Sequence, residues 1–344
     1  MKVTYIALDP SRYPRVKKIA YSLKKRGDIE FHVMLPKIRL VPRGGRIKRM
    51  IYAIVNYSAI LLQIFFVKSD AFWVANSPDI LALPLVFRRK RYILEYRSPW
   101  AFEVENEFGL KPLVRLAAII ENLALKHAGL VTLTTSRLMA KVNGFGKPVF
   151  VIPNYPLKTF GAVTVSKEKL CKNSGCGKDD KVVLFVGKLS HVEGADLLPK
   201  IIEGVLKETN VSFWIVGDGP IYQPLEENTK KSPKVKMFGW QPHEKIPSFI
   251  AAADVCIAPR HKSPFSVFYN EEGLQKLSEY MFFEKPIVAC GVAESQEYLL
   301  VDENEMADGI LKALNGSVRP SKRKIWEDYS EKKIYEMLSS IQPK

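Results

Sequence analysis

The sequence predicts an α/β protein made of two Rossmann-like, doubly wound domains. A length of 344 residues is sufficient for two domains. Near residue 3 and again near residue 181, a run of buried-strand type passes through a loop into an amphipathic helix. The polar segment 155–180 separates the two stretches and is expected to be a linker. Parallel sheets of this kind bind ligands at the carboxyl ends of their strands, so the candidate site residues are sought there.

The first domain is expected to span residues 1–160 and to open as strand, helix and strand. Residues 3–8 and 31–35 are predicted strands, and between them apolar residues recur at helical spacing until Gly27 ends the helix: Val16, Ile19, Ala20 and Leu23. The sequence has no G-x-G-x-x-G fingerprint at this first turn, which disfavours a nicotinamide-binding domain.

Residues 50–67 form an 18-residue apolar segment that contains Asn56, Ser58 and Gln63. This length is at the short end for a membrane span and the polar residues disfavour one, so a buried or surface crossover helix is the favoured interpretation. Five cations in or beside the segment would suit docking on anionic lipid, or would simply be solvated: Arg39, Arg43, Arg46, Lys48 and Arg49.

The rest of the first domain continues with a strand, turn and helix over residues 71–87, a strand that ends at Arg97, a long amphipathic helix, and strands at 130–134 and 149–154. Arg97 and Ser98 stand at the end of this second strand, and Trp100 comes two residues later. Arg97 would provide a permanent cation for a phosphate or an acceptor anion, but it cannot act as a general base. Glu103, Glu105 and Glu107 are expected in an acidic loop, solvated or near an acceptor.

The second domain is expected to span residues 180–324. It opens with a strand that runs into Gly187 and Lys188, followed by a helix, and a glycine-containing helix N-terminus favours phosphate. A second strand ends at Gly217, and a third ends before Trp240 and Gln241. Trp240 is interpreted as either a core residue or a residue that stacks near a ligand, and His243 as a surface residue at a helix start.

Residues 270–289 carry two carboxylates, Glu271 and Glu279, around a predicted helix over residues 274–283, with a buried strand at 287–289. A turning approach to this helix could bring both carboxylates to one end, where they would accept hydrogen bonds from sugar or ribose hydroxyls. On the pattern alone, a surface helix with solvated acids fits equally well.

The net charge of +16 is confined to the first half of the chain. Residues 1–150 contain 26 Lys and Arg against 10 Asp and Glu, whereas residues 151–344 contain 26 of each kind. The first domain is therefore expected to face an anionic partner such as membrane headgroups or a diphosphate-bearing lipid, while nucleic acid is disfavoured because no recognised binding motif is present.

Four cysteines with irregular spacing give no disulfide framework or zinc motif, although Cys171 and Cys176 are close enough in sequence for a local bridge. With no signal peptide recognised, the expected location is the cytoplasm, peripheral to the inner face of a membrane.

Several of these motifs together resemble glycosyltransferase family 4, whose members are retaining enzymes of the GT-B fold. The resemblance rests on Glu271-x7-Glu279 and on the run K-L-S-E-Y-M followed by K-P, at Lys276, Leu277, Glu279, Tyr280, Met281, Lys285 and Pro286. It extends to G-K-L at 187–189, G-D-G-P at 217–220 and V-I-P-N at 151–154. In this sequence Glu193 stands where the family has a lysine, Ser98 where it often has an aspartate, and Phe283-Glu284 replace a small residue and glycine.

The resemblance implies a role for each matched position. Glu279 would bind ribose, Glu271 the transferred sugar, and Trp240 and Gln241 the base, while Gly187, Gly217 and the loop from Lys188 to Glu193 would bind the diphosphate. Arg97, Ser98 and Trp100 would lie on the acceptor side, and the last helix, 325–344, would pack back on the first domain. Arg260, Lys262 and Lys276 are candidates to supply the cation that Glu193 replaces.

The expected function is transfer of a sugar, with retention, from a nucleoside-diphosphate sugar to a lipid-linked or polysaccharide acceptor. Lys188, Glu271 and Arg97 are the expected catalytic residues. No metal or cofactor is expected. The alternative is a non-catalytic subunit that binds a nucleotide sugar, because Glu193 and Ser98 both depart from the family pattern.

Overall fold

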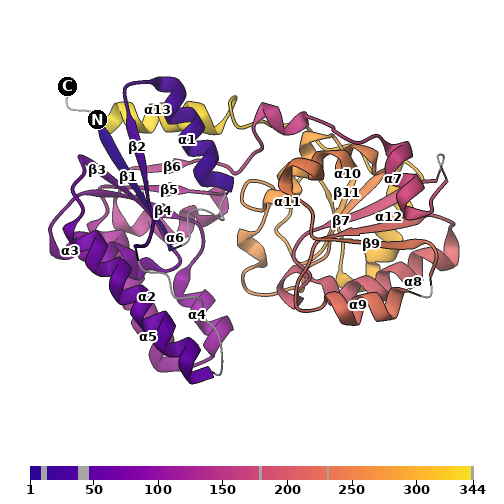
Figure 1. Cartoon of the computed structure of the whole chain (residues 1–344), viewed down its shortest axis with the longest axis horizontal. Helices are drawn as coiled ribbons and strands as arrows, with labels where there is room; N and C mark the ends of the chain where they lie inside the picture. Colours follow the sequence, from indigo (N-terminus) through magenta and orange to yellow (C-terminus); the bar gives the residue numbers. More distant parts are fainter. Residues whose placement is uncertain (9–13, 38–45, 178–179, 231, 342–344) are drawn as a thin grey trace. The chain divides into compact units, whose positions relative to one another are not determined.

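The computed structural model describes residues 1–8, 14–37, 46–177, 180–230 and 232–341. The chain forms two α/β units: unit 1 comprises residues 1–153 and 329–344, and unit 2 comprises residues 154–328 (Figure 1). Each unit contains a six-stranded parallel sheet. The predicted fold class, two doubly wound domains, is therefore confirmed.

Unit 1 has the strand order β2-β1-β3-β4-β5-β6. Its strands are β1 (Lys2–Ile6), β2 (Glu30–Met34), β3 (Ala71–Ala75), β4 (Tyr92–Tyr96), β5 (Leu130–Leu133) and β6 (Val149–Val151). Its helices are α1 (Pro14–Arg26), α2 (Arg46–Phe66), α3 (Leu83–Phe87), α4 (Trp100–Phe108), α5 (Lys111–His127), α6 (Met139–Val142) and α13 (Ser330–Ile341).

The sequence pattern explains most of these elements. Gly27 follows α1 with φ +82°, as a left-handed residue after a helix requires. The crossover helix favoured for residues 50–67 is confirmed as α2, although the predicted acidic loop at Glu103 to Glu107 is wrong because these residues belong to α4. Within the described residues, no helix is sufficiently long and apolar to cross a membrane. Arg39 and Arg43 lie outside the described residues.

Helix α13 comes from the far end of the chain and packs on α1. Glu331 accepts a hydrogen bond from Ser22 Oγ at 3.0 Å and forms an ion pair with Lys25 Nζ at 2.7 Å. Tyr335 donates its hydroxyl to the Ser22 carbonyl at 2.9 Å, and Ser330 Oγ donates to the Pro153 carbonyl at 2.6 Å. The end of the described chain is therefore part of unit 1.

Unit 2 has the strand order β12-β11-β10-β7-β8-β9. Its strands are β7 (Val182–Val186), β8 (Ser212–Val216), β9 (Val235–Gly239), β10 (Val255–Ala258), β11 (Ile287–Ala289) and β12 (Leu299–Leu300). Its helices are α7 (Lys167–Ser174), α8 (Leu198–Glu208), α9 (Tyr222–Thr229), α10 (Ile246–Ala252), α11 (Gln275–Phe282) and α12 (Met306–Leu314).

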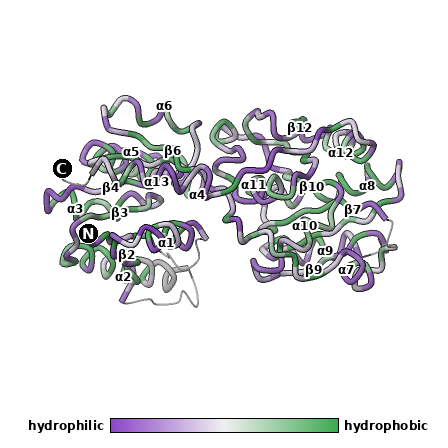
Figure 2. Tube along the Cα trace, turned by 90° about the horizontal axis from the view of Figure 1, so that it is seen from above, coloured by the Kyte–Doolittle hydropathy of each residue, from purple (hydrophilic) through white to green (hydrophobic). Residues whose placement is uncertain are grey.

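The core of unit 2 has two layers because side chains alternate across the sheet. Val182 and Leu184 of β7 pack with residues of α7, α10 and α11, whereas Val183 and Phe185 pack with α8, α9 and α12. Hydrophobic stretches run through the strands of both units in Figure 2. Helices on both faces leave the carboxyl ends of the strands as the edge where polar loops gather.

Residues 155–180, expected as a linker, belong to unit 2. Leu170 and Cys171 of α7 are buried in its core, and Cys171 forms a disulfide with Cys176. The sequence of this segment is polar on average, but its few apolar residues are sufficient to fix α7 against α10.

Candidate functional site

The loops after β7 and β8 lie against each other at the carboxyl edge of the unit 2 sheet. The Gly187 N–H donates to the Val216 carbonyl at 3.0 Å, and the Gly217 N–H donates to the Gly239 carbonyl at 2.9 Å. Gly217 has φ +146°, and a Cβ atom there would lie 1.8 Å from the Gly187 oxygen. Only glycine permits this approach, so the two loops form a backbone-lined surface.

A cluster of charged side chains lies beside this surface. One carboxylate oxygen of Glu193 is 2.6 Å from Arg260 Nη1, and the other is 2.6 Å from Lys276 Nζ. The Lys276 ammonium also lies 4.7 Å from the Phe185 ring centroid, and a Cβ on Gly187 would be 3.0 Å from it. Two cations therefore surround one carboxylate directly beside the glycine turn.

The environment keeps Glu193 ionised. Burial by itself would raise the pKa of this carboxyl, but the charges of Lys276 and Arg260 outweigh burial and hold the pKa at about 2. With Glu193 charged, the cluster retains one net positive charge. Of the three cations suggested from the sequence, Arg260 and Lys276 pair with Glu193, whereas the backbone N–H of Lys262 donates to Glu303.

Lys188 is exposed in the loop after β7 and forms no ion pair among the described residues. Helix α11 is attached to the end of β7 through its own Tyr280. The buried hydroxyl of Tyr280 accepts a hydrogen bond from the Val186 N–H at 2.9 Å. The tyrosine of the motif thus fixes α11, which carries Lys276 and Glu279, to the end of β7.

Glu279 is buried in α11 and has two partners that the sequence did not predict. Its Oε1 lies 2.7 Å from His243 Nε2 and 2.6 Å from Gln275 Nε2. His243 is exposed and is the first residue of a short 3-10 helix (His243–Lys245), as expected from the sequence, and in addition it contacts Glu279. The only sequence signal was its place after β9, at the carboxyl edge shared with the other site residues.

Trp240 and Gln241 follow β9 on the same edge. Gln241 donates its side-chain amide to the Phe238 carbonyl at 2.9 Å, whereas Trp240 is 70% exposed. The core alternative for Trp240 is therefore wrong. Its exposed ring remains available for stacking against a flat ligand.

Glu271 lies in the turn before α11 and is 7% exposed. Its Oε1 is 4.0 Å from Lys324 Nζ, and its Oε2 is buried without a hydrogen-bond partner among the described residues. Such an atom is a ready acceptor for a ligand hydroxyl. Glu271 and Glu279 contact different partners, so each carboxylate is held separately.

In unit 1, Arg97, Ser98 and Trp100 follow β4, and Asn76, which follows β3, holds the first two. Arg97 donates its backbone N–H to Asn76 Oδ1 and its Nη2 to the Asn76 carbonyl, both at 2.8 Å. The Asn76 amide donates to the Ser98 carbonyl at 2.6 Å, and Ser98 Oγ also bonds Glu103. Trp100 begins α4 and is half-buried.

Comparison with known proteins agrees with this architecture. Residues 180–316, all within unit 2, match the family model described as Glycosyl transferases group 1. The chain is similar to a structure of HepE from Anabaena in complex with UDP and glucose, with a TM-score of 0.66 and 16% identity over 99% of this chain and 100% of that one. The fold of the chain is GT-B.

Two curated relatives are also similar in sequence. The 2-deoxystreptamine glucosyltransferase of Streptomyces kanamyceticus is 26% identical over 52% of this chain and 46% of its own length. The teichuronic acid biosynthesis glycosyltransferase TuaC of Bacillus subtilis, a putative assignment in its name, is 24% identical over 58% of this chain and 48% of its own. The chain spans less than half of the length of the curated relatives that it matches.

Proposed function

We propose that the protein is a glycosyltransferase that moves a sugar, with retention of anomeric configuration, from a nucleoside-diphosphate sugar to a glycan or lipid-linked acceptor. The observation that carries the proposal is the cluster of Glu193, Arg260 and Lys276 beside the glycine-lined loops of unit 2. The match of residues 180–316 to group 1 glycosyltransferases supports it.

The leaving diphosphate is the group that this cluster stabilises. Backbone N–H groups of the glycine loops, Lys188 and the net positive charge of the cluster act on the charge that develops as the bond between the anomeric carbon and the diphosphate oxygen breaks. The acceptor oxygen forms the new bond and passes its proton to the departing phosphate, so the protein needs no general base. These cations supply the charge that a metal ion would otherwise provide, and the transfer is proposed to be metal-independent.

The donor is held at three further points in this proposal. Glu279, oriented by His243 and Gln275, accepts hydrogen bonds from the ribose hydroxyls. The unpartnered oxygen of Glu271 accepts one from the transferred sugar, and residues 240–241 contact the base. The UDP complex of HepE makes UDP sugars the first donors to test.

The acceptor is proposed to reach the protein through unit 1, where Arg97, Ser98 and Trp100 contact it. This unit carries the excess positive charge of the chain. Helices α5 and α2 expose apolar side chains: Leu113, Leu116, Ile119 and Leu123 on α5, and Ile51, Ile54, Leu62 and Phe66 on α2. A basic unit with exposed apolar helices suits peripheral docking on an anionic membrane, proposed here to be the cytoplasmic face.

The non-catalytic alternative loses its main support. It was motivated by Glu193 in place of a lysine, but Arg260 and Lys276 restore a positive charge there. Ser98 is the second residue that differs from the family pattern, and it forms hydrogen bonds with Asn76 and Glu103.

Calorimetric titration with UDP, GDP and ADP sugars tests the proposal, followed by a transfer assay with the donor that binds. We expect one nucleotide class to bind and Glu279→Ala to weaken binding by about 1–3 kcal/mol, the size of lost hydrogen bonds to a charged group. Glu227→Ala, at an exposed position on α9, is the matched control and leaves binding unchanged. A folded protein that binds none of these donors would refute the proposed function.

A further inference from the structure

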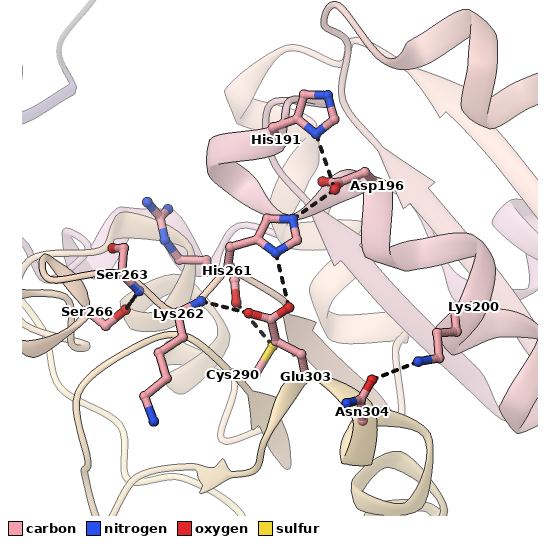
Figure 3. Close-up of polar contacts among 11 residues, drawn as sticks. His191, Asp196, Lys200, His261, Lys262, Ser263, Ser266, Cys290, Glu303 and Asn304 are labelled. Carbon is pink, nitrogen blue, oxygen red and sulfur yellow. Dashed lines mark hydrogen bonds and ion pairs between the residues drawn. The ribbon is translucent and has the colours of Figure 1, made fainter. Parts of the chain in front are cut away.

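A second group of side chains in unit 2 has no part in the donor site described above. Asp196 Oδ2 lies 3.2 Å from His191 Nδ1 and 2.8 Å from His261 Nε2. The three potential ligand atoms all lie within 4.8 Å of one another. Figure 3 shows His191, Asp196 and His261 in a row, with Glu303 on the far side of His261.

The local fold explains why these residues meet. His191 and Asp196 lie on either side of Gly194, which joins two short 3-10 turns with φ +66°. A Cβ on Gly194 would lie 2.4 Å from the Pro259 carbonyl oxygen, so the turn packs directly against the chain that leaves β10. His261 is two residues after Pro259 and thus faces the turn. The arrangement depends on a close backbone contact, not on mobile side chains alone.

We propose that His191, Asp196 and His261 bind one Zn²⁺ ion, with a fourth position left for water. Two imidazole nitrogens and one carboxylate oxygen form a common ligand set for this metal. Ligand bonds of about 2.0–2.1 Å in a tetrahedron place the ligand atoms about 3.3 Å apart. The separations of 2.8 and 3.2 Å between Asp196 and the two histidines are within a few tenths of an ångström of this value, and the two histidine nitrogens, within 4.8 Å of each other, would move closer on binding.

Glu303 gives this set the outer partner that a metal-binding histidine needs. His261 Nδ1 lies 3.1 Å from Glu303 Oε2, and Glu303 Oε1 accepts the Lys262 N–H at 2.7 Å. When Nδ1 carries the proton that it donates to Glu303, the lone pair of Nε2 is left on the side of Asp196. Metal-binding histidines typically donate their other ring N–H to a carboxylate, which fixes the tautomer and ring orientation.

The proposed ligands are open to solvent. Exposure increases from Asp196 at 27% through His261 at 42% to His191 at 79%, so the ion has direct access from solvent.

The metal would join the two segments that also carry the charge cluster. His191 is two residues from Glu193, and His261 directly follows Arg260. Zinc would thus hold the turn carrying Glu193 against the segment carrying Arg260. Binding of zinc itself is independent of the glycosyl-transfer proposal and can be tested without any donor.

The test is titration of untagged protein with ZnCl₂ after treatment with a chelator and dialysis. We expect one Zn²⁺ per chain, and a loss of affinity in His191→Ala and His261→Ala of at least the roughly 10- to 100-fold that removal of an outer partner costs. His127→Ala changes another exposed histidine, whose Nδ1 bonds only the Leu123 carbonyl among the described residues, and should bind like the native chain.

Two further measurements make the result decisive. Glu303→Gln retains all three ligands and should keep the stoichiometry while it weakens binding about 10- to 100-fold. Cobalt substituted for zinc should give the intense visible absorption of four-coordinate Co²⁺, and His191→Ala should remove it. His191 is the most exposed ligand, so that variant folds normally. Native affinity in both histidine variants, or no zinc binding by the native chain, overturns the proposal.

Discussion

Lys276 and Glu193 form an ion pair in which the ammonium nitrogen and a carboxylate oxygen are 2.6 Å apart. Helix α11 contributes the lysine and the loop after β7 contributes the glutamate, 83 positions earlier in the chain. Arg260 contacts the other oxygen of the same carboxylate. Glu193, which stands where the related family has a lysine, is therefore one of three charged residues, and the other two, Arg260 and Lys276, are cations.

The first prediction concerns this pair. Lys276→Met should destabilise the protein by about 1–3 kcal/mol, because it removes a partner from a largely buried carboxylate. Glu193→Gln in the same chain should recover part of the loss, with a coupling energy of about 0.5–3 kcal/mol in the double-mutant cycle. Urea unfolding of the native protein, both single variants and the double variant measures it. Strict additivity would show that the pair contributes no interaction energy.

The second prediction is a pH dependence that arises from Glu193. Its pKa in the folded protein is about 2, below the ordinary value of 4.5. Since the folded pKa is depressed, the stabilisation is present above about pH 4.5 and is lost as the pH falls towards 2, with a size on the order of 3 kcal/mol. The free energy of unfolding of Glu193→Gln should fall less steeply than that of the native protein between pH 5 and 3. Parallel curves would contradict the assignment.

The third prediction concerns the contact between Gly217 and Gly187. Gly217→Ala should cost more than about 3 kcal/mol, because its Cβ would overlap the Gly187 oxygen and the backbone would have to move. Gly175→Ala is the control: Gly175 also has a positive φ, +77°, but nothing lies near its Cβ position. Strain alone should cost about 1 kcal/mol there. Equal losses of thermal stability in the two variants would argue against the close approach.

The fourth prediction tests membrane docking. Leu116→Glu and Ile119→Glu on α5 should reduce binding to vesicles that contain anionic lipid, since each places a charge on an exposed apolar surface. Added salt should also weaken the binding of the native protein. Val267→Glu, at a similarly exposed apolar residue in unit 2, should bind normally. Vesicle flotation measures this, and equal binding by all variants would exclude α5 as the docking surface.

The hydrophobic periodicity of the sequence, together with the Gly and Pro residues at the ends of elements, was sufficient to predict the fold. The alternation of buried strands and amphipathic helices predicted both parallel sheets. Gly27 marked the end of α1, and the Lys285-Pro286 pair marked the boundary between α11 and β11. These features depend on residues close together in the chain, where local geometry determines the pattern.

The partners within the site could not be predicted in the same way. Glu279 and His243 are 36 positions apart, and Glu193 and Arg260 are 67 apart. Such pairs depend on which strand ends become neighbours in the sheet and on where each loop turns. The sequence suggested Arg260 and Lys276 as charges near the diphosphate loop, but not that both would bind the same carboxylate. It contained no local sign that His191, Asp196 and His261 converge.

The contacts of α13 with α1 have a consequence for biosynthesis. Unit 2 is one uninterrupted stretch of chain, whereas unit 1 needs residues from both sides of it. As the polypeptide leaves the ribosome, residues 154–328 can therefore complete their core while unit 1 still lacks a helix. Until Ser330 to Ile341 are synthesised, Ser22 and the face of α1 around it stay uncovered, so unit 1 completes its fold after unit 2 although most of its residues precede unit 2 in the chain.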